Sequence, residues 1–296
     1  MIEQMDGRSM RTFVAVLEER SLSKAAARLG YVQSTITAQI QQMEQLMGVR
    51  LFQRLPRGVE PTEAGKAIAP FAYRFLQLGQ SLQDQLSGLD EPKGPVRMRA
   101  LESFCVPHLP QLLPAFIRQY PQIELHFETG FQHDIVEEVN AYRIDLGIVP
   151  SDPQLPQMEF IPLFSDELVW VAASELACGM QDGEWGNLPQ VKVISYGGRC
   201  IYHHIVEREL QKKGVIHFSV MEFDSLEMIK QTVICGMGAA LLPFSSVQAE
   251  IASGRLTRVK TDTSIPINHG LICMKDRELS TAARIWKDRL LDWFQT

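Results

Sequence analysis

The sequence predicts an N-terminal all-α winged helix-turn-helix with a long linker helix, followed by a two-lobed α/β domain. Three observations predict this fold class. Residues 1–60 carry short apolar stripes with helical spacing, residues 64–82 continue in one long stripe, and strands alternate with helices from residue 96 onward. A chain of 296 residues has room for about two domains. We expect a first domain over 1–60, a linker helix over 61–90 and a second domain over 91–296.

The stretch YVQSTITAQIQQMEQLMG, residues 31–48, predicts a helix with one buried face and one neutral polar face. Ile36, Ile40, Met43 and Met47 recur at spacings of four, three and four. The opposite face carries no lysine or arginine, and its amides and hydroxyls suit base edges in DNA. The alternative is an inert solvated surface. The residues that we expect to contact bases are Gln33, Ser34, Thr35, Thr37, Ala38 and Gln39.

The neighbouring segment SLSKAAARLG, residues 21–30, predicts a second short helix that is close in space to the first. Ser21 or Ser23 can cap its N-terminus, and Gly30 can end it. Two short helices joined by a tight turn form a helix-turn-helix, and small alanines between them allow a close crossing. An upstream apolar stripe completes a trihelical core: Met10, Phe13, Val14 and Leu17.

Residues 49–65, VRLFQRLPRGVEPTEAG, predict a small β-hairpin, or wing. Apolar and polar residues alternate in this segment, and the chain then turns at LPRG. Arg50, Arg54 and Arg57 lie on or near the expected hairpin. Arginine on a wing can reach phosphates or a narrow minor groove. Residues 1–58 hold eight Lys or Arg and five Asp or Glu, a balance of +3, whereas the whole chain carries −6. The basic first domain therefore favours nucleic acid, and the acidic remainder does not.

These residues together resemble the LysR-type transcriptional regulators. The run FVAVLEERSLSKAAARLGYVQSTITAQIQQMEQLMGVRLFQRLPRGVEPTEAG is similar to the N-terminal signature of that family, and a weaker likeness continues over the rest of the chain. The sequence departs from the family pattern at Val32, where a capping Ser is frequent, at Ser34, where Pro is frequent, and at Ala38, where a basic residue is common. The resemblance implies a DNA-binding regulator with a periplasmic-binding-protein-like effector domain.

An apolar seam predicts that the long helix pairs with a second copy of itself. From Ala64 onward, the apolar residues are spaced alternately four and three positions apart, as in a heptad repeat. A two-fold dimer would place two reading helices on successive half-sites. The alternative is a helix packed on its own domain, and Pro70 can kink it. The expected seam is Ile68, Phe71, Phe75, Leu78 and Leu82. The resemblance implies the same homodimer and, usually, a homotetramer. The segment SGLDEPKGP, residues 87–95, then predicts a hinge.

From residue 96 the alternation of strands and helices predicts α/β structure with largely parallel sheets. We expect one lobe over 96–162 and 269–296 and a second over 163–268. In such sheets ligands lie beyond the carboxyl ends of strands, where helix N-termini point. Polar turns at these places predict an effector site between the lobes. Its expected residues are Ser103, Phe104, Thr129, Gly130, Tyr196, Arg199 and Ser225.

Several helix N-termini and Arg199 favour a small anionic effector, such as a carboxylate metabolite or an inorganic oxyanion. The alternatives are that each Ser or Thr only caps a helix and that Arg199 is an exposed loop arginine. Five cysteines, with no Cys-x-x-Cys, indicate buried small side chains and no disulfide framework or zinc site. Cys200, in a glycine-rich loop, is the one candidate for a redox-sensing thiol.

The sequence argues against an enzyme. It contains no Gly-x-Ser-x-Gly, no Walker loop and no His-Glu-x-x-His. GMGAALLP has the glycines of a dinucleotide-binding loop. Such a loop runs from a strand to a helix, whereas here the glycines end a helix and precede a strand. Adjacent His203 and His204 are poorly placed to share a metal. We therefore expect no catalytic residue, no metal and no cofactor.

No stretch approaches the roughly 20 apolar residues of a membrane span, and no signal peptide core is present in residues 1–30. We expect a cytoplasmic protein that contacts no membrane. Its expected partners are double-stranded DNA, a small-molecule effector and further copies of itself. The alternative function is a cytosolic solute-binding module or enzyme with an appended DNA-binding head.

Overall fold

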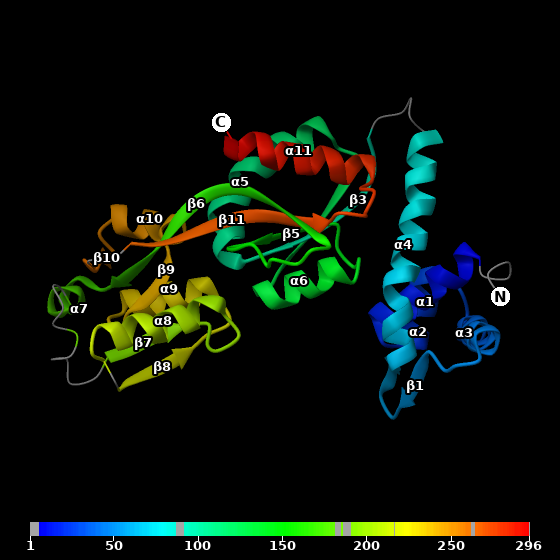
Figure 1. Cartoon of the computed structure of the whole chain (residues 1–296), viewed down its shortest axis with the longest axis horizontal. Helices are drawn as coiled ribbons and strands as arrows, with labels where there is room; N and C mark the ends of the chain where they lie inside the picture. The colour runs from blue at the N-terminus through cyan, green and yellow to red at the C-terminus, as the bar shows by residue number, and fades with distance from the viewer. Residues whose placement is uncertain are drawn as a thin grey trace.

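The computed structural model describes residues 6–86, 92–180, 185, 191–215, 217–261 and 264–295. Figure 1 shows two parts along the longest axis of the molecule: a helical N-terminal head with one long helix, and an elongated α/β region. The head comprises α1 (Gly7–Glu19), α2 (Leu22–Leu29), α3 (Gln33–Met47), β1 (Phe52–Leu55), β2 (Gly58–Pro61) and, packed against them, α4 (Glu63–Leu86). These elements confirm the predicted winged helix-turn-helix and long helix.

The trihelical core forms from the predicted apolar stripes. Phe13 on α1 and Ile36 on α3 are fully buried, and Met43 is 1% exposed. Ser21 caps α2, because its hydroxyl accepts a hydrogen bond from the backbone N–H of Lys24 at 3.3 Å. Gly30 ends α2 with a φ of 71°, a conformation in which glycine avoids steric strain. The helix-turn-helix is therefore determined by local caps and one shared core.

The wing is held against the helices by a backbone hydrogen bond at one end and by a side-chain carboxylate at the other. Val59 on β2 donates from its N–H to the carbonyl of Arg20 at the end of α1, at 3.0 Å. Gly58 has a φ of 109°, and a Cβ there would lie 2.4 Å from the same carbonyl oxygen. At the other end, the carboxylate of Glu44 on α3 accepts the N–H groups of Leu51 and Phe52. The wing therefore has a defined position beside α3.

Helix α4 leaves most of its predicted seam uncovered. Phe71, Phe75, Leu78 and Leu82 are 67, 45, 66 and 58% exposed, whereas Ile68 packs against the core of the head. Pro70 lies within the helix. Most of the predicted hinge, residues 87–91, lies outside the described residues. Gly94 and Pro95, which the sequence pattern assigns to that hinge, instead open the first strand of the α/β region.

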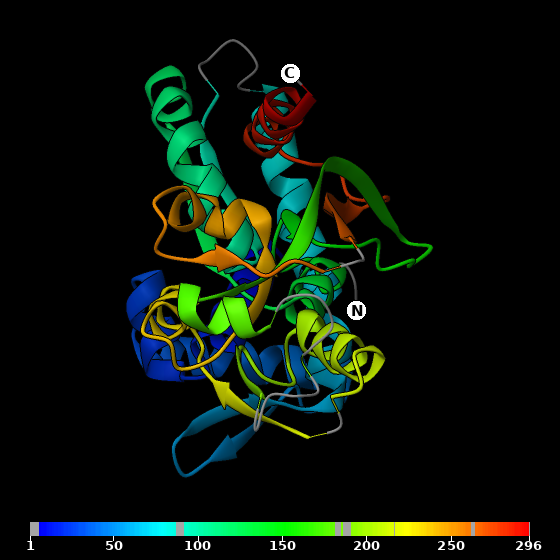
Figure 2. The same cartoon turned by 90° about the vertical axis from the view of Figure 1, so that its left-hand side faces the viewer.

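The α/β region is organised around one seven-stranded sheet. Its first lobe contains β3 (Gly94–Ala100), α5 (Glu102–Gln119), β4 (Ile123–Thr129), α6 (Gln132–Asn140), β5 (Leu146–Val149) and α11 (Thr281–Gln295). Two long strands, β6 (Met158–Ala172) and β11 (Ile265–Met274), continue into the second lobe. The strand order is β10-β6-β11-β5-β3-β4, with β9 also paired to β6. Figure 2 shows the region from one end.

The second lobe adds a small two-stranded sheet and its helices. Its elements are α7 (Ser174–Gly179), β7 (Val191–Ser195), α8 (Ile201–Lys212), β8 (Phe218–Glu222), α9 (Leu226–Ile234), β9 (Ala240–Pro243), α10 (Phe244–Ala252) and β10 (Thr257–Arg258). The prediction of largely parallel sheets is wrong for the strands that join the lobes. β3 pairs parallel to β4 and β5, and β7 to β8, but β6 pairs antiparallel to β9, β10 and β11.

The two long antiparallel strands that connect the lobes, β6 and β11, contain an irregularity in their pairing. Their register shifts between His269 and Gly270, which pair with Phe164 and Pro162 and leave Leu163 without a pairing partner. A β-bulge of this kind bends and twists a strand. The predicted lobe boundaries, 162/163 and 268/269, lie at this bulge. Within the described residues, no helix is long and apolar enough to cross a membrane.

Candidate DNA-reading surface and effector pocket

Helix α3 presents the predicted polar face outward. Ser34 and Ala38 are exposed or partly exposed, as are Thr35 and Thr37. Val32 at the N-cap makes no side-chain hydrogen bond, so the first N–H groups of α3 are not satisfied by a capping side chain. Such N–H groups can contact a DNA phosphate. The helix therefore exposes neutral polar side chains and an N-terminus without a capping side chain.

Three of the predicted reading residues also have structural contacts. The side-chain carbonyl of Gln39 accepts a hydrogen bond from the hydroxyl of Thr12, which is fully buried, at 2.6 Å. Gln39 therefore ties α3 to α1 through its side-chain oxygen, and base contact through its amide nitrogen stays a prediction. The carbonyl of Gln33 accepts from Ser23 at 2.9 Å and leaves the amide nitrogen available. The Thr37 hydroxyl donates to the backbone carbonyl of Gln33 at 3.0 Å.

The wing supplies the positive charge that α3 lacks. Arg54 lies on β1 and Arg57 lies in the turn, and both side chains are exposed. Within the described part of the chain, neither guanidinium makes an ion pair or hydrogen bond. Exposed, unpaired arginines beside a neutral reading helix suit phosphate or minor-groove contact.

A pocket of about 130 Å³ lies between the two lobes, where the predicted turns converge. Four predicted residues line it: Ser103, Thr129, Gly130 and Tyr196. Sequence reasoning missed six others: Leu101, Glu102, Phe131, Cys200, Tyr202 and Asp224. Glu102 and Asp224 lie in the same polar turns from which the site was predicted, so the sequence pattern could have identified both residues.

Glu102 joins the lobes across this pocket. It lies in the first turn of α5, in lobe one, and its carboxylate accepts the N–H of Leu226, the first residue of α9 in lobe two, at 2.8 Å. The same oxygen accepts the hydroxyl of Tyr196 at 3.1 Å. Burial, together with the charge of Glu102, raises the pKa of Tyr196, which therefore stays protonated as the donor. Lobe one thus supplies the N-terminal cap for a helix of lobe two.

Three other helix N-termini open toward the pocket without a capping side chain. The N-cap residues are Leu101 for α5, Phe131 for α6 and Cys200 for α8, and all three line the cavity. The buried hydroxyls of Ser103 and Tyr202 interact with each other, and neither has another hydrogen-bond partner among the described residues. A buried hydroxyl that lacks full hydrogen bonding costs free energy unless a ligand or water completes it. The cavity therefore has the composition of a small-molecule site.

Three predicted effector residues do not line the pocket. Phe104 is fully buried among aromatic rings, because one step along α5 turns its side chain away from the lobe interface. Ser225 is the N-cap of α9 but makes no side-chain capping bond, and the N–H of the next residue, Leu226, donates to Glu102 instead. The guanidinium of Arg199 pairs with Asp134 at 3.0 Å and lies 5.0 Å from the Phe131 ring centre.

The cysteines and paired histidines have ordinary surroundings. All five cysteines are free, but Cys178 and Cys235 are exposed, which corrects the expectation of uniformly buried thiols. Burial raises the pKa of Cys200 to about 11, which disfavours the thiolate that a redox sensor needs. A ring nitrogen of His203 and one of His204 lie 3.7 and 3.5 Å from carboxylate oxygens of Glu207, and no cluster of the described residues could hold a metal ion.

Comparison with known proteins gives matches over both parts of the chain. Residues 8–66 match the model of the bacterial regulatory helix-turn-helix protein, lysR family, and residues 89–295 match the LysR substrate binding domain. The HTH-type transcriptional regulator YofA of Bacillus subtilis is 32% identical over 243 residues, which cover 82% of this chain and 83% of YofA.

Solved structures share the fold. A full-length OxyR from Pseudomonas aeruginosa has a TM-score of 0.77 at 21% identity, covering 99% of this chain and 95% of that one. Full-length LysG from Corynebacterium glutamicum, solved with bound arginine as effector, has a TM-score of 0.68 at 16% identity, covering 97% of each chain.

Proposed function

The chain belongs to the LysR family of bacterial transcriptional regulators, and we propose that its α3 and wing read DNA while its interlobe pocket binds the effector. The observation that carries this proposal is a pocket lined from both lobes in the same chain as an exposed reading helix. The family is not enzymatic, and we assign no catalytic residue or cofactor. The cytoplasm, which holds bacterial DNA, is the compartment that this function requires.

Base reading is assigned to the outward face of α3, and phosphate contact to the wing. Ser34, Thr37 and Ala38 face away from the core, and the Gln33 amide lies beside them with its nitrogen available. Arg54 and Arg57 follow on the wing with no competing carboxylate among the described residues. Phosphate contacts position a protein on DNA and base-edge contacts read the sequence, so the wing and α3 would divide these two roles.

The pocket supports an effector that carries both a carboxylate and a cationic or hydrogen-bond-donating group. The uncapped N-termini of α5, α6 and α8 favour a negative group, together with the Ser103 hydroxyl. Glu102 and Asp224 add two carboxylates to the lining, and none of the described lining residues is basic. A small amino acid or related zwitterion carries a negative group for the helix N-termini and a positive group for the two carboxylates. The proposed effector therefore keeps the predicted anionic group, but Arg199 is not its main partner.

Pairing through α4 supports a homodimer. Phe71, Phe75, Leu78 and Leu82 form a continuous exposed stripe on one side of the helix. Four large apolar side chains in water are unfavourable, and a second copy would bury them in a coiled-coil seam. Ile68 contributes less than predicted, because it packs partly within its own head. Assembly of dimers into a tetramer through the effector domains remains a proposal from the family pattern.

A mobility-shift assay with the region upstream of the protein's own gene tests the DNA-binding part. We expect retardation of that fragment at concentrations that leave a scrambled fragment unbound. Equal retardation of both fragments would favour the alternative function, a solute-binding module or enzyme with an appended head.

A thermal-shift screen of the full chain tests the effector site. Amino acids, dicarboxylates and polyamines are compared, and a ligand at a hundred times its Kd should stabilise the protein by about 2.7 kcal/mol. We expect an amino-acid hit whose shift shrinks in Ser103→Ala and Thr129→Val but changes little in Arg199→Ala. A hit unaffected by Ser103→Ala and Thr129→Val would move the effector site elsewhere.

A further inference from the structure

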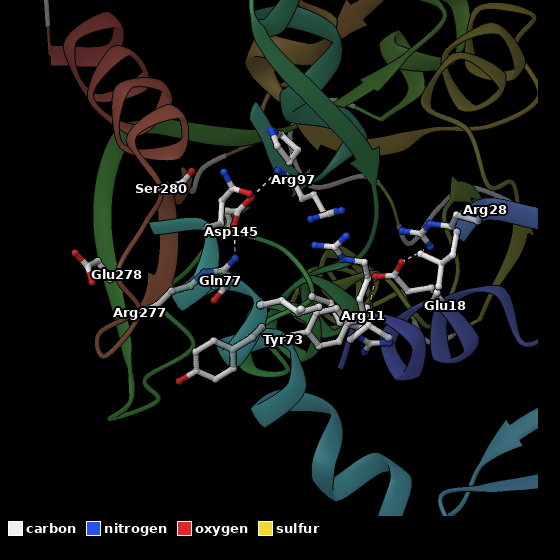
Figure 3. A pocket seen from close by; sticks show the side chains of 18 residues that line it. Arg11, Glu18, Arg28, Tyr73, Gln77, Arg97, Asp145, Arg277, Glu278 and Ser280 are labelled. Atoms are coloured by element: carbon white, nitrogen blue, oxygen red, sulfur yellow. Dashed lines mark hydrogen bonds and ion pairs between the residues drawn. The ribbon is translucent and has the colours of Figure 1, made fainter. Parts of the chain in front are cut away.

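A second cavity, of about 280 Å³, lies where the head and α4 meet lobe one of the effector domain. Its walls come from α1, α2, α4, the start of β3, the segment after α6 and the turn after β11 (Figure 3). Five arginines line it: Arg11, Arg28, Arg97, Arg143 and Arg277. No part of the proposed DNA-reading surface or effector pocket includes these residues.

Two of the five arginines are neutralised by carboxylates in the wall. Arg28 pairs with Glu18 at 2.5 Å, and Arg277 pairs with Asp145. Both carboxylates have further donors, because Glu18 accepts the Tyr73 hydroxyl at 3.1 Å and Asp145 accepts the N–H of Arg97 at 2.7 Å. Dashed lines in Figure 3 mark several of these contacts. Glu18 and Asp145 are therefore already engaged.

The other three arginines have no such partner. Within the described residues, the guanidinium groups of Arg11, Arg97 and Arg143 make no hydrogen bond or ion pair. Glu278 is the remaining acid of the lining, and Figure 3 places it at the far side of the pocket from Arg11 and Arg97. Three exposed guanidinium groups thus line a cavity in which Glu278 supplies one further carboxylate, so positive charge is in excess.

The arginines are close enough to influence the titration of their neighbours. Burial lowers the pKa of Arg277, and the charge of Arg97 lowers it further. Burial raises the pKa of Tyr73, and the charges of Arg143 and Arg97 oppose that rise. A positive potential therefore extends across the cavity wall. Guanidinium groups suit phosphate oxygens because they present paired donors in a planar fork. The cavity is smaller than most drug-sized ligand pockets, which favours a compact polyanion.

We propose that this junction is a second ligand site, which binds a small phosphate-bearing anion through Arg11 of the head and through Arg97 and Arg143 of lobe one. The anion would join two parts that few described direct contacts link, among them the ion pair of Arg74 on α4 with Asp276 at 3.0 Å. Occupancy would therefore restrain the head relative to the effector domain, which gives the regulator a second input.

The proposed site stays accessible when α4 pairs with a second copy. Tyr73, Leu76, Gln77 and Gln80 are the α4 residues that line the cavity. At 100° per residue they lie on the opposite side of the helix from Phe71, Phe75, Leu78 and Leu82. Dimerisation through the exposed stripe therefore does not cover the junction.

Titration calorimetry on the full-length protein tests the site with inorganic pyrophosphate as the probe. We expect saturable binding that sodium chloride at matched ionic strength does not reproduce. Arg11→Gln and Arg97→Gln should each weaken binding by at least about tenfold, a change of 1.4 kcal/mol. Arg118→Gln is the matched control and should bind as the wild type does, because Arg118 is an exposed arginine of α5 outside the cavity with no partner among the described residues.

The requirement for one residue from the head and one from lobe one separates a junction site from general attraction of anions. Absence of saturable heat, or equal losses in the Arg97→Gln and Arg118→Gln variants, would overturn the proposal. Retention of full affinity in Arg11→Gln would overturn it also, because the head would then take no part. Calorimetry involves no DNA and no effector, so its outcome does not depend on the proposed function.

Discussion

The carboxylate of Glu102 in lobe one caps α9 of lobe two by accepting the backbone N–H of Leu226 at 2.8 Å. An anion from one lobe thus occupies the helix N-terminus of the other, at the edge of the proposed effector pocket. An effector carboxylate that reached α9 would have to displace Glu102. The relative position of the lobes is therefore coupled to this contact, together with the ion pair of Arg199 with Asp134.

Glu102→Ala should destabilise the effector domain by about 0.5–2 kcal/mol, the usual cost of losing an N-cap. Urea unfolding followed by tryptophan fluorescence measures this, since Trp170, Trp185 and Trp286 are buried in the domain. Glu175→Ala, at the start of α7, is the control, because that exposed carboxylate has no described partner. Equal stability of the Glu102→Ala protein and the wild type would show that the cap does not stabilise the domain.

Acid should destabilise the protein through His269. Burial lowers the pKa of this fully buried ring to about 4, and the ordinary value near 6.5 applies when the chain unfolds. The unfolded state therefore binds a proton that the folded state refuses, so stability falls as the pH drops from about 6.5 toward 4. Burial shifts the pKa of His108 in the same direction, while nearby Asp166 opposes both shifts.

Between pH 7.5 and pH 5, His269 should lower the free energy of unfolding by about 2 kcal/mol, which corresponds to about 1.36 kcal/mol per pH unit below 6.5. Chemical unfolding at the two pH values measures it. His269→Phe keeps an aromatic ring against Phe164, whose centre lies 4.9 Å away, and removes the titration. A pH dependence as steep in that variant as in the wild type would assign the effect to other groups.

Phe75→Glu should convert dimers to monomers, because a charge within the exposed α4 stripe opposes burial against a second copy. Light scattering gives the mass directly, and circular dichroism checks that the fold persists. Met228→Glu is the control, since Met228 is 51% exposed on α9 and lies outside the stripe. A dimer that survives Phe75→Glu would place the interface on another surface.

Arg57→Gln should weaken binding to all DNA sequences alike. The slope of log K against log salt should become shallower by about 0.9 for each phosphate that the variant no longer neutralises. Binding is measured by fluorescence anisotropy at several salt concentrations, with Arg118→Gln as a charge-matched control on α5. An unchanged slope would mean that the wing arginine does not bind a phosphate.

Gln33→Ala should relax base preference and leave the salt slope nearly unchanged. A good bidentate base contact is worth about 1–3 kcal/mol of discrimination, and the Gln33 amide nitrogen is available for one. The affinity ratio between specific and scrambled DNA measures this preference. Ser23→Ala is the companion variant, because it removes the Gln33 hydrogen bond within the head but not the amide itself. Full discrimination by Gln33→Ala would contradict its assignment to the reading face.

The sequence by itself determined which segments of the head form helices and which of their faces are buried. Apolar spacing placed Ile36, Ile40 and Met43 in the core of the head, and the turns after strands identified Ser103 and Thr129 as pocket residues. These conclusions follow from local periodicity, because a 3.6-residue helix and the end of a strand constrain side-chain direction without reference to distant parts.

Only the tertiary structure decided which neighbours those side chains meet. Gln39 turns inward to Thr12, Phe104 enters an aromatic core, and Arg199 meets Asp134 of the other lobe. Glu102 and Leu226 are 124 positions apart, so no local pattern could pair them. The physical reason is that hydrogen bonds and ion pairs depend on distances of about 3 Å, which are set when separately folded elements pack together.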